Sequence, residues 1–110
     1  MGAATQQQRV SQNEATSRHI NEAIEERLWS GEKRSAKTFL CECGRTDCNH
    51  VVHITPREYE TVRANPRRFV VYPGHQIPEL ETIVDAQGGY LVVEKEGEAG
   101  QVAEASDPRR

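Results

Sequence analysis

The chain contains three cysteines, and all of them lie within eight consecutive residues, at Cys41, Cys43 and Cys48. Thiolates this close together, with imidazoles nearby, are typical of a tetrahedral site for one soft metal ion, and Zn²⁺ is the usual ion in Cys3His sites. Cys41 and Cys43 are separated by one residue, so the chain must turn sharply for both sulfurs to face one ion, and Gly44 favours that turn. The spacing therefore predicts a zinc site.

Each of the four histidines is a candidate for the fourth ligand of this site. His75 follows a Pro-Gly turn at the end of a predicted strand, a position that can present its imidazole to a neighbouring loop, and it is the preferred ligand. His50 is the alternative, because it lies two residues after Cys48 and is near but cramped. His53 is expected to point away from the buried face of its strand, and His19 is expected on the surface of a helix.

A closed Cys3His site predicts structural rather than catalytic zinc, because four protein ligands leave no position for a reacting water. The sequence also contains no His-x-Glu or His-Glu-x-x-His pattern that would supply a general base. We therefore expect no enzymatic activity, and a zinc that organises a module for interaction or regulation. A redox-sensing zinc-thiolate switch is the alternative, since oxidation of Cys41, Cys43 or Cys48 would expel the metal.

The size and composition of the chain indicate a small domain whose hydrophobic core needs further stabilisation by a metal ion or a disulfide. It has 110 residues, of which 35% are hydrophobic and 28% charged, and a net charge of -3. At this size a hydrophobic core supplies only a few kcal/mol, so a metal is a useful supplement. The sequence has neither a basic leader with an apolar stretch nor a transmembrane segment, and its odd cysteine count favours a reducing compartment, so we expect a cytoplasmic protein with no membrane contact.

The charge balance gives little support to nucleic-acid binding, which is a further alternative. Its candidate residues are Arg57, Arg63, Arg67 and Arg68. The first two are six apart on a predicted helix and are poorly aligned, and the net charge does not resemble the strongly basic footprint of a general nucleic-acid binder. A protein partner of unknown identity is the preferred expectation.

The first part of the chain is expected to hold a disordered segment, a helix and a linker. Residues 1–10 are glutamine-rich and are predicted to be disordered. A helix is predicted over residues 11–30, because Ser11 and Glu14 form a capping-box pattern and Ile20, Ile24 and Leu28 recur every four residues. That apolar stripe either docks on its own domain or engages a partner. Residues 31–37 form a polar linker.

Residues 38–96 are predicted to form a zinc-binding α+β domain with a small, mostly antiparallel sheet and one short helix. Strands over 38–40 and 50–54 are expected to pair across the metal-bearing loop. The capping box from Thr55 to Glu58 begins the short second helix. A strand over 68–72 precedes the Pro-Gly turn, and a hairpin over 81–96 is expected to use positive φ angles at Gly88 and Gly89. Residues 97–110 read as a flexible acidic tail.

The chain resembles a group of small actinobacterial zinc-binding-like proteins, and the resemblance covers about half of its length. The shared motifs are Phe-x-Cys-Glu-Cys, a third cysteine, a Thr-x-x-Glu-Tyr helix, Phe-x-Val-x-Pro-Gly-His and a closing Tyr-x-Val-Val-Glu-Lys strand. They correspond here to Phe39–Cys43, Cys48, Thr55–Tyr59, Phe69–His75 and Tyr90–Lys95. The resemblance implies that Cys41, Cys43, Cys48 and His75 are the metal ligands, and it implies no particular activity. His50 and His53 lie outside the shared pattern.

Overall fold

The computed structural model describes residues 5–109, which form three helices and five strands. In chain order the elements are α1 (Gln6–Leu28), β1 (Lys37–Leu40), β2 (Val51–Ile54), α2 (Pro56–Arg63), β3 (Arg68–Val71), β4 (Glu81–Ala86), β5 (Leu91–Lys95) and α3 (Gly97–Ala105). The fold is α+β, as the sequence predicted.

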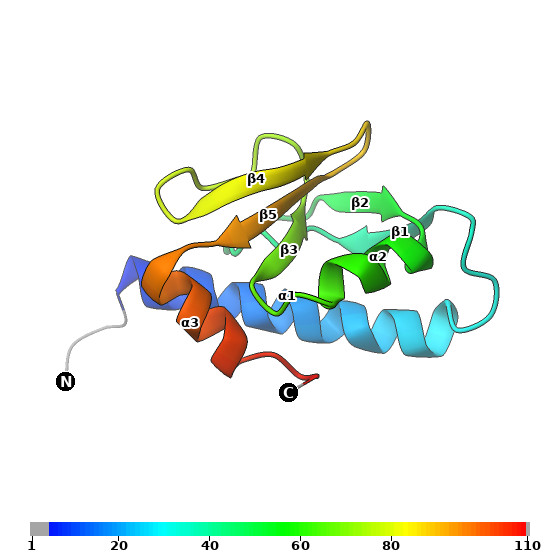
Figure 1. Cartoon of the computed structure of the whole chain (residues 1–110), viewed down its shortest axis with the longest axis horizontal. Helices are drawn as coiled ribbons and strands as arrows, with labels where there is room; N and C mark the ends of the chain where they lie inside the picture. The colour runs from blue at the N-terminus through cyan, green and yellow to red at the C-terminus, as the bar shows by residue number, and fades with distance from the viewer. Residues whose placement is uncertain (1–4, 110) are drawn as a thin grey trace.

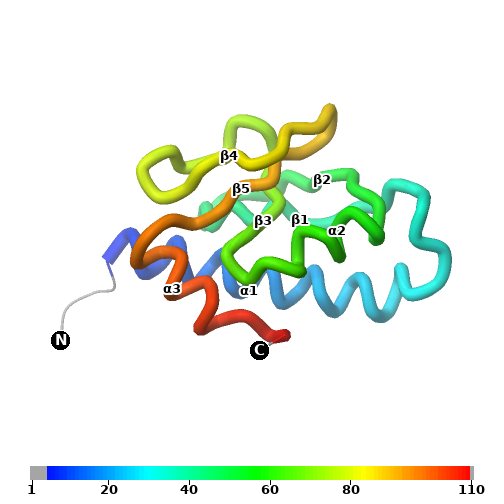
Figure 2. Tube along the Cα trace, viewed as in Figure 1, coloured from blue at the N-terminus to red at the C-terminus, as the bar shows by residue number. Residues whose placement is uncertain are grey.

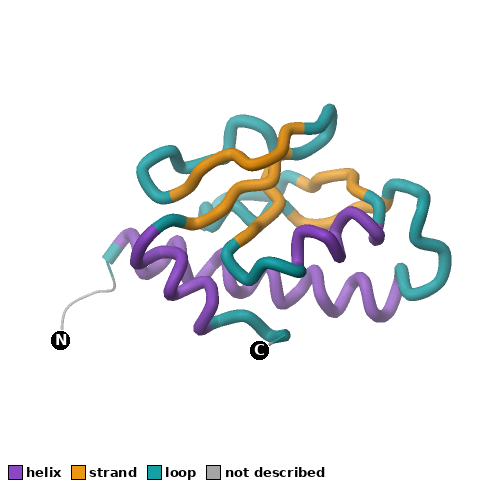
Figure 3. Tube along the Cα trace, viewed as in Figure 1, coloured by secondary structure: helices purple, strands orange, loops and turns teal. Residues whose placement is uncertain are grey.

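The long helix α1 extends along one edge of the molecule, and both sheets lie above it in Figure 1. The molecule measures 47 × 25 × 25 Å, and a 23-residue helix is about 35 Å long, so α1 runs along most of the long axis. The tube in Figure 2 shows that the last segment of the chain returns to α1, where α3 contacts it. Figure 3 shows that long loops, drawn in teal, connect α1 to β1 and β3 to β4.

The two sheets are antiparallel, and each confirms a pairing that the sequence predicted. In the first, β1 pairs with β2, and Phe39 lies opposite Val52. In the second, the order is β3-β5-β4, and β5 pairs with both neighbours. The short helix α2 begins at the predicted capping box, because the Thr55 side chain accepts from the Glu58 amide and the Glu58 side chain accepts from the Thr55 amide. Local sequence therefore determined these elements.

The core consists of two clusters that share the strands β3 and β5. Val70 and Val92 belong to a cluster with the aromatic side chains of β1 and α2, where the rings of Phe39 and Tyr59 stack at 4.6 Å. The second cluster contains the next residues of the same strands together with two of the cysteines. Its members are Cys41, Cys43, Phe69, Val71, Leu91, Val93 and Ala103. The strands are thus buried on both faces, and the cysteine loop is part of the core.

The helix α1 docks on its own domain through a polar face and not through the predicted apolar stripe. Its buried residues are Glu14, Arg18, Asn21 and Glu25. Ile20 is 42% exposed and Leu28 is 64% exposed. Ile24 alone of the predicted stripe packs against the core. The expectation was wrong because the surface beneath α1 offers backbone groups, a lysine and a carboxylate, for which polar side chains are the better complement.

The predicted boundaries of α1 also differ from the structure. Residues 5–10, which were expected to be disordered, hold the N-cap and the first turn of the helix, while residues 1–4 lie outside the described part of the chain. Thr5 and Gln8 make the capping box, with the Thr5 amide donating to Gln8 Oε1 at 2.8 Å and the Gln8 amide donating to Thr5 Oγ1 at 3.1 Å. The Ser11 and Glu14 pattern is therefore not the helix start. The buried Glu14 carboxylate instead pairs with Lys95.

The predicted acidic tail is instead the helix α3. Ala99 and Ala103 are buried, and Gly100 lies so close to Arg67 that an added Cβ would meet its guanidinium at 2.5 Å. Small side chains bury little area but allow a close approach, and a sequence pattern of large apolar residues does not reveal such a helix.

The turn between β4 and β5 also differs from the prediction. Positive φ angles were expected at Gly88 and Gly89, but the glycines with positive φ angles are Gly44, Gly74 and Gly97.

Candidate metal centre

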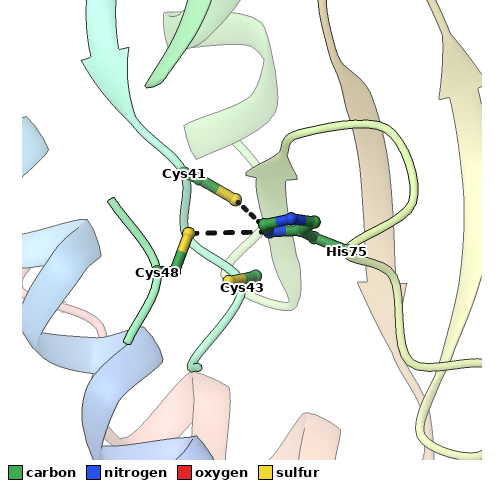
Figure 4. A group of neighbouring side chains, drawn as sticks. All are labelled: Cys41, Cys43, Cys48 and His75. Carbon is green, nitrogen blue, oxygen red and sulfur yellow. Dashed lines mark hydrogen bonds between the residues drawn. The ribbon is translucent and has the colours of Figure 1, made fainter. Parts of the chain in front are cut away.

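Cys41, Cys43, Cys48 and His75 come together where the end of β1 meets the end of β3. Cys41 directly follows β1, and Cys43 and Cys48 lie in the loop between β1 and β2. His75 reaches the loop from the opposite side, after the turn at Gly74, where the His75 amide donates to the Tyr72 carbonyl at 2.9 Å. Figure 4 shows the imidazole pointing toward the sulfurs.

The distances from the His75 imidazole to two of the sulfurs match the edges of a coordination tetrahedron. His75 Nδ1 lies 3.6 Å from Cys41 Sγ and 3.5 Å from Cys48 Sγ. Zinc–sulfur and zinc–nitrogen bonds of about 2.3 and 2.0 Å place sulfur and nitrogen about 3.5 Å apart on a tetrahedron. One donor atom from each of the four residues lies within 4.8 Å of all the others, so the group can hold a metal ion.

Neighbouring backbone groups act to lower the pKa of all three cysteine thiols. The Tyr72 amide donates to Cys41 Sγ at 3.1 Å. The Arg45 backbone acts to lower the pKa of Cys43, and the His50 backbone acts in the same direction on the pKa of Cys48. Hydrogen bonds of this kind favour the thiolate over the thiol, and thiolates are the form that binds metal. The backbone around the loop therefore opposes the rise in pKa that burial causes in these thiols.

The pKa values of the three thiols are shifted in different directions, so that one thiol ionises more readily than the other two. A hydrogen bond from Cys41 lowers the pKa of Cys43 to about 4, and the same bond, together with burial, raises the pKa of Cys41. Burial raises the pKa of Cys48. One thiolate is therefore formed readily, and the other two protons would be released when a metal binds, as metal–thiolate formation requires.

Glu42, between two of the cysteines, is fully buried. Its Oε2 accepts from Asn21 Nδ2 at 2.9 Å and from the Tyr59 hydroxyl at 2.8 Å. Its Oε1 accepts from the Val70 amide at 3.0 Å, and its own amide donates to the Val70 carbonyl at 2.8 Å. Burial raises its pKa, and these hydrogen bonds oppose the shift. Glu42 thus ties the cysteine loop to α1, α2 and β3 at once.

The N-terminal half of α1 closes the cysteine loop from the other side. Asn13 Nδ2 donates to the Gly44 carbonyl at 2.9 Å. A Cβ on Gly44, whose φ is +81°, would lie 2.8 Å from Val10 O and from Glu14 Cγ. Only glycine permits both this backbone conformation and this approach. The predicted turn at Gly44 is confirmed, and its contact with α1 is additional.

The remaining histidines lie outside the four-residue group. His50 is exposed, and its ring stacks on Tyr72 with centroids 4.3 Å apart. His19 and His53 are exposed, as expected. The structure therefore brings His75 and not His50 among the sulfurs, which supports the preferred assignment of the fourth ligand. That assignment stays a prediction until a metal is measured.

Three of the four arginines considered for nucleic-acid binding have carboxylate partners. Arg63 is 2% exposed and pairs with Asp107. Arg67 pairs with Glu104 at 3.1 Å, and Arg68 pairs with Glu94 at 2.9 Å. Arg57 is exposed. Because Arg63 is buried and the neighbouring carboxylates offset the other charges, these residues do not gather into a common basic face.

A second group of possible metal ligands lies in the described residues, where α1 meets α2. It consists of Glu22, Glu25 and Glu60. The guanidinium of Arg109 contacts all three carboxylates, donating to Glu22 Oε1 at 2.8 Å and to Glu25 Oε1 at 3.4 Å. A cation of the chain itself therefore already occupies the space between them, and this cluster joins the C-terminal segment to the two helices.

No family model, no curated protein and no solved structure matches this chain. The types and geometry of the four residues are therefore what indicate a metal centre. Within residues 5–109 none of the helices combines the length and the apolar character needed to cross a bilayer.

Proposed function

We propose that this chain is a small zinc-binding protein in which Cys41, Cys43, Cys48 and His75 hold one structural Zn²⁺. The observation that carries the proposal is the placement of His75 Nδ1 at tetrahedral-edge distances, 3.5 and 3.6 Å, from two sulfurs. Three thiolates and one imidazole favour zinc over hard ions such as Mg²⁺ or Ca²⁺, which prefer oxygen ligands.

The proposed role of the metal is to organise the domain. The cysteine loop contacts α1 through Asn13 and Gly44, and Glu42 extends the contacts to α2 and β3. An ion that fixes this loop fixes the junction between the two sheets. Structural zinc contributes about 10 to 16 kcal/mol of apparent binding free energy, comparable to the whole stability of a small domain of about 5 to 15 kcal/mol.

We further propose that the protein is non-catalytic and acts in the cytoplasm as an interaction or regulatory module. Four side-chain donors would complete the coordination shell and leave no place for a substrate or a reacting water. The partner is a protein in this proposal. The redox-sensing alternative concerns how the centre responds to oxidants, and it stays a separate prediction.

The proposal is tested by metal analysis of the purified protein and of Cys43→Ser. We expect one zinc per wild-type chain, and we expect the variant to lose zinc and its near-UV circular dichroism together, because the loop loses both an ion and a core side chain that is 2% exposed. Asp47→Asn is the matched control, since this residue of the same loop is exposed and outside the four-residue group. A Cys43→Ser protein that keeps its tertiary structure without metal would overturn the organising role.

A further inference from the structure

Three aromatic rings pack together on the outer side of the candidate metal centre. The His50 ring stacks on Tyr72 with centroids 4.3 Å apart and planes inclined by 29°. It meets the His75 ring edge-on, with centroids 4.8 Å apart and planes at 86°. The Tyr72 and His75 rings are 5.4 Å apart at 64°. Each ring therefore contacts the other two in a geometry that aromatic pairs prefer.

The backbones of His50 and Tyr72 are both hydrogen-bonded to Cys41, whose sulfur faces His75. Tyr72 donates its amide to Cys41 Sγ at 3.1 Å. The His50 carbonyl accepts from the Cys41 amide at 3.2 Å. The backbone thus fixes both rings relative to the centre, and their side chains lie on the surface, with Tyr72 39% exposed.

His75 needs such support because it does not lie in a strand. It follows β3 by four residues and precedes β4 by six, in a loop whose local anchor is the hydrogen bond from its amide to the Tyr72 carbonyl. That bond positions the backbone and leaves the imidazole to be oriented by its neighbours. Groups that orient a metal-binding imidazole change metal affinity by about 10- to 100-fold when they are removed.

We propose that His50 is a positioning residue of the metal centre: with Tyr72 it covers His75, holds the imidazole toward the sulfurs and slows the loss of the metal. His50 contributes a ring and not a ligand atom. The inference rests on the proposed zinc centre and adds the feature that sets how long the ion is retained. It also gives a physical role to a histidine that lies outside the four-residue group.

The test is the rate at which the zinc-loaded protein gives up Zn²⁺ to an excess of a chromogenic chelator. We expect His50→Ala to release zinc about 10-fold faster than wild type, because the loss of one outer partner of a ligand lowers metal affinity by at least about that factor and a less firmly held imidazole leaves the ion sooner. His50→Phe keeps a ring but has no nitrogen, and it should release zinc at a rate close to that of wild type. His53→Ala removes an exposed histidine of β2 and is the matched control, with no expected change.

The outcomes separate this inference from the proposed function. If wild type binds no zinc, the zinc centre itself fails before the variants are compared. If wild type binds zinc and His50→Phe loses it as fast as His50→Ala, His50 is a ligand and the positioning role is wrong. Equal rates for His50→Ala and wild type would also overturn it. The visible absorption of the Co²⁺-substituted protein gives a second readout, because His50→Phe should leave the ligand set, and hence the spectrum, unchanged.

Discussion

Replacing Asn21 by Ala tests the unexpected polar docking of α1. Asn21 is fully buried, and its amide acts as a short piece of backbone beside β1. Oδ1 accepts from the Leu40 amide at 2.8 Å, and Nδ2 donates to the Leu40 carbonyl at 2.9 Å. Nδ2 also donates to Glu42 Oε2 at 2.9 Å. Alanine removes all three bonds and leaves the groups of Leu40 and Glu42 without this partner.

The expected loss of stability follows from counting these bonds. Two neutral hydrogen bonds contribute about 1 kcal/mol each, and a bond to a carboxylate contributes about 1.5 to 3 kcal/mol. Alanine is a better helix former than asparagine, which offsets these losses by about 0.6 kcal/mol. The net loss is therefore about 3 to 4 kcal/mol, a large part of the stability of a small domain.

Urea denaturation of the metal-loaded protein measures this loss. With an m value of about 2 kcal/mol per M, the midpoint should fall by roughly 1.5 to 2 M. Asn13→Ala is the matched control, because Asn13 is on the same helix and is half-buried, with one hydrogen bond to Gly44 O at 2.9 Å and a longer one to Thr46 Oγ1 at 3.4 Å. It should lose no more than about 1 kcal/mol. Equal losses for the two variants would refute the conclusion that the polar face anchors α1.

Two further predictions concern the packing of α1 against the cysteine loop and against β5. Gly44→Ala should destabilise the protein by about 1 to 2 kcal/mol more than Gly74→Ala in urea melts, because both glycines have positive φ angles but only Gly44 lies against Val10 and Glu14; similar losses would contradict the close approach. Burial raises the pKa of Glu14 from 4.5 to about 7 although Lys95 pairs with it. The folded state therefore binds a proton that the unfolded state releases above about pH 4.5, and stability relative to Glu14→Gln should fall by on the order of 3 kcal/mol as the pH rises from 4.5 through 7. A pH-independent difference between these two proteins in thermal melts would contradict the buried carboxylate.

Several parts of the fold were predictable because short stretches of sequence contain their physical cause. The capping box that begins at Thr55 fixes the start of α2, and Val52 and Ile54, which alternate with exposed residues, fix the buried face of β2. The capping box of Thr5 and Gln8 is also a local signal, but no apolar periodicity follows it closely, so the sequence pattern places the helix start later. Local signals of this kind act over a few residues and can be recognised in the sequence without a tertiary structure.

Other features were not predictable because their cause lies far away in the chain. The polar face of α1 is explained by Leu40, Glu42 and Lys95, and none of these is near the helix in sequence. The helix α3 buries small residues. Their contribution to packing depends on how closely Arg67 and the Lys95 carbonyl approach the helix at Gly100. Hydrophobic periodicity records the average burial of residue types, so it fails where a helix docks by hydrogen bonds or by close contact.

The sequence by itself determined the chemistry of this protein, and the tertiary structure decided its arrangement. Three cysteines within eight residues need only a local turn of the chain to converge on one ion. The choice of His75 over His50 as their neighbour depended on how β1 and β3 meet. The burial of Glu42 depended on three donors from α1, α2 and β3, which only the folded chain brings together.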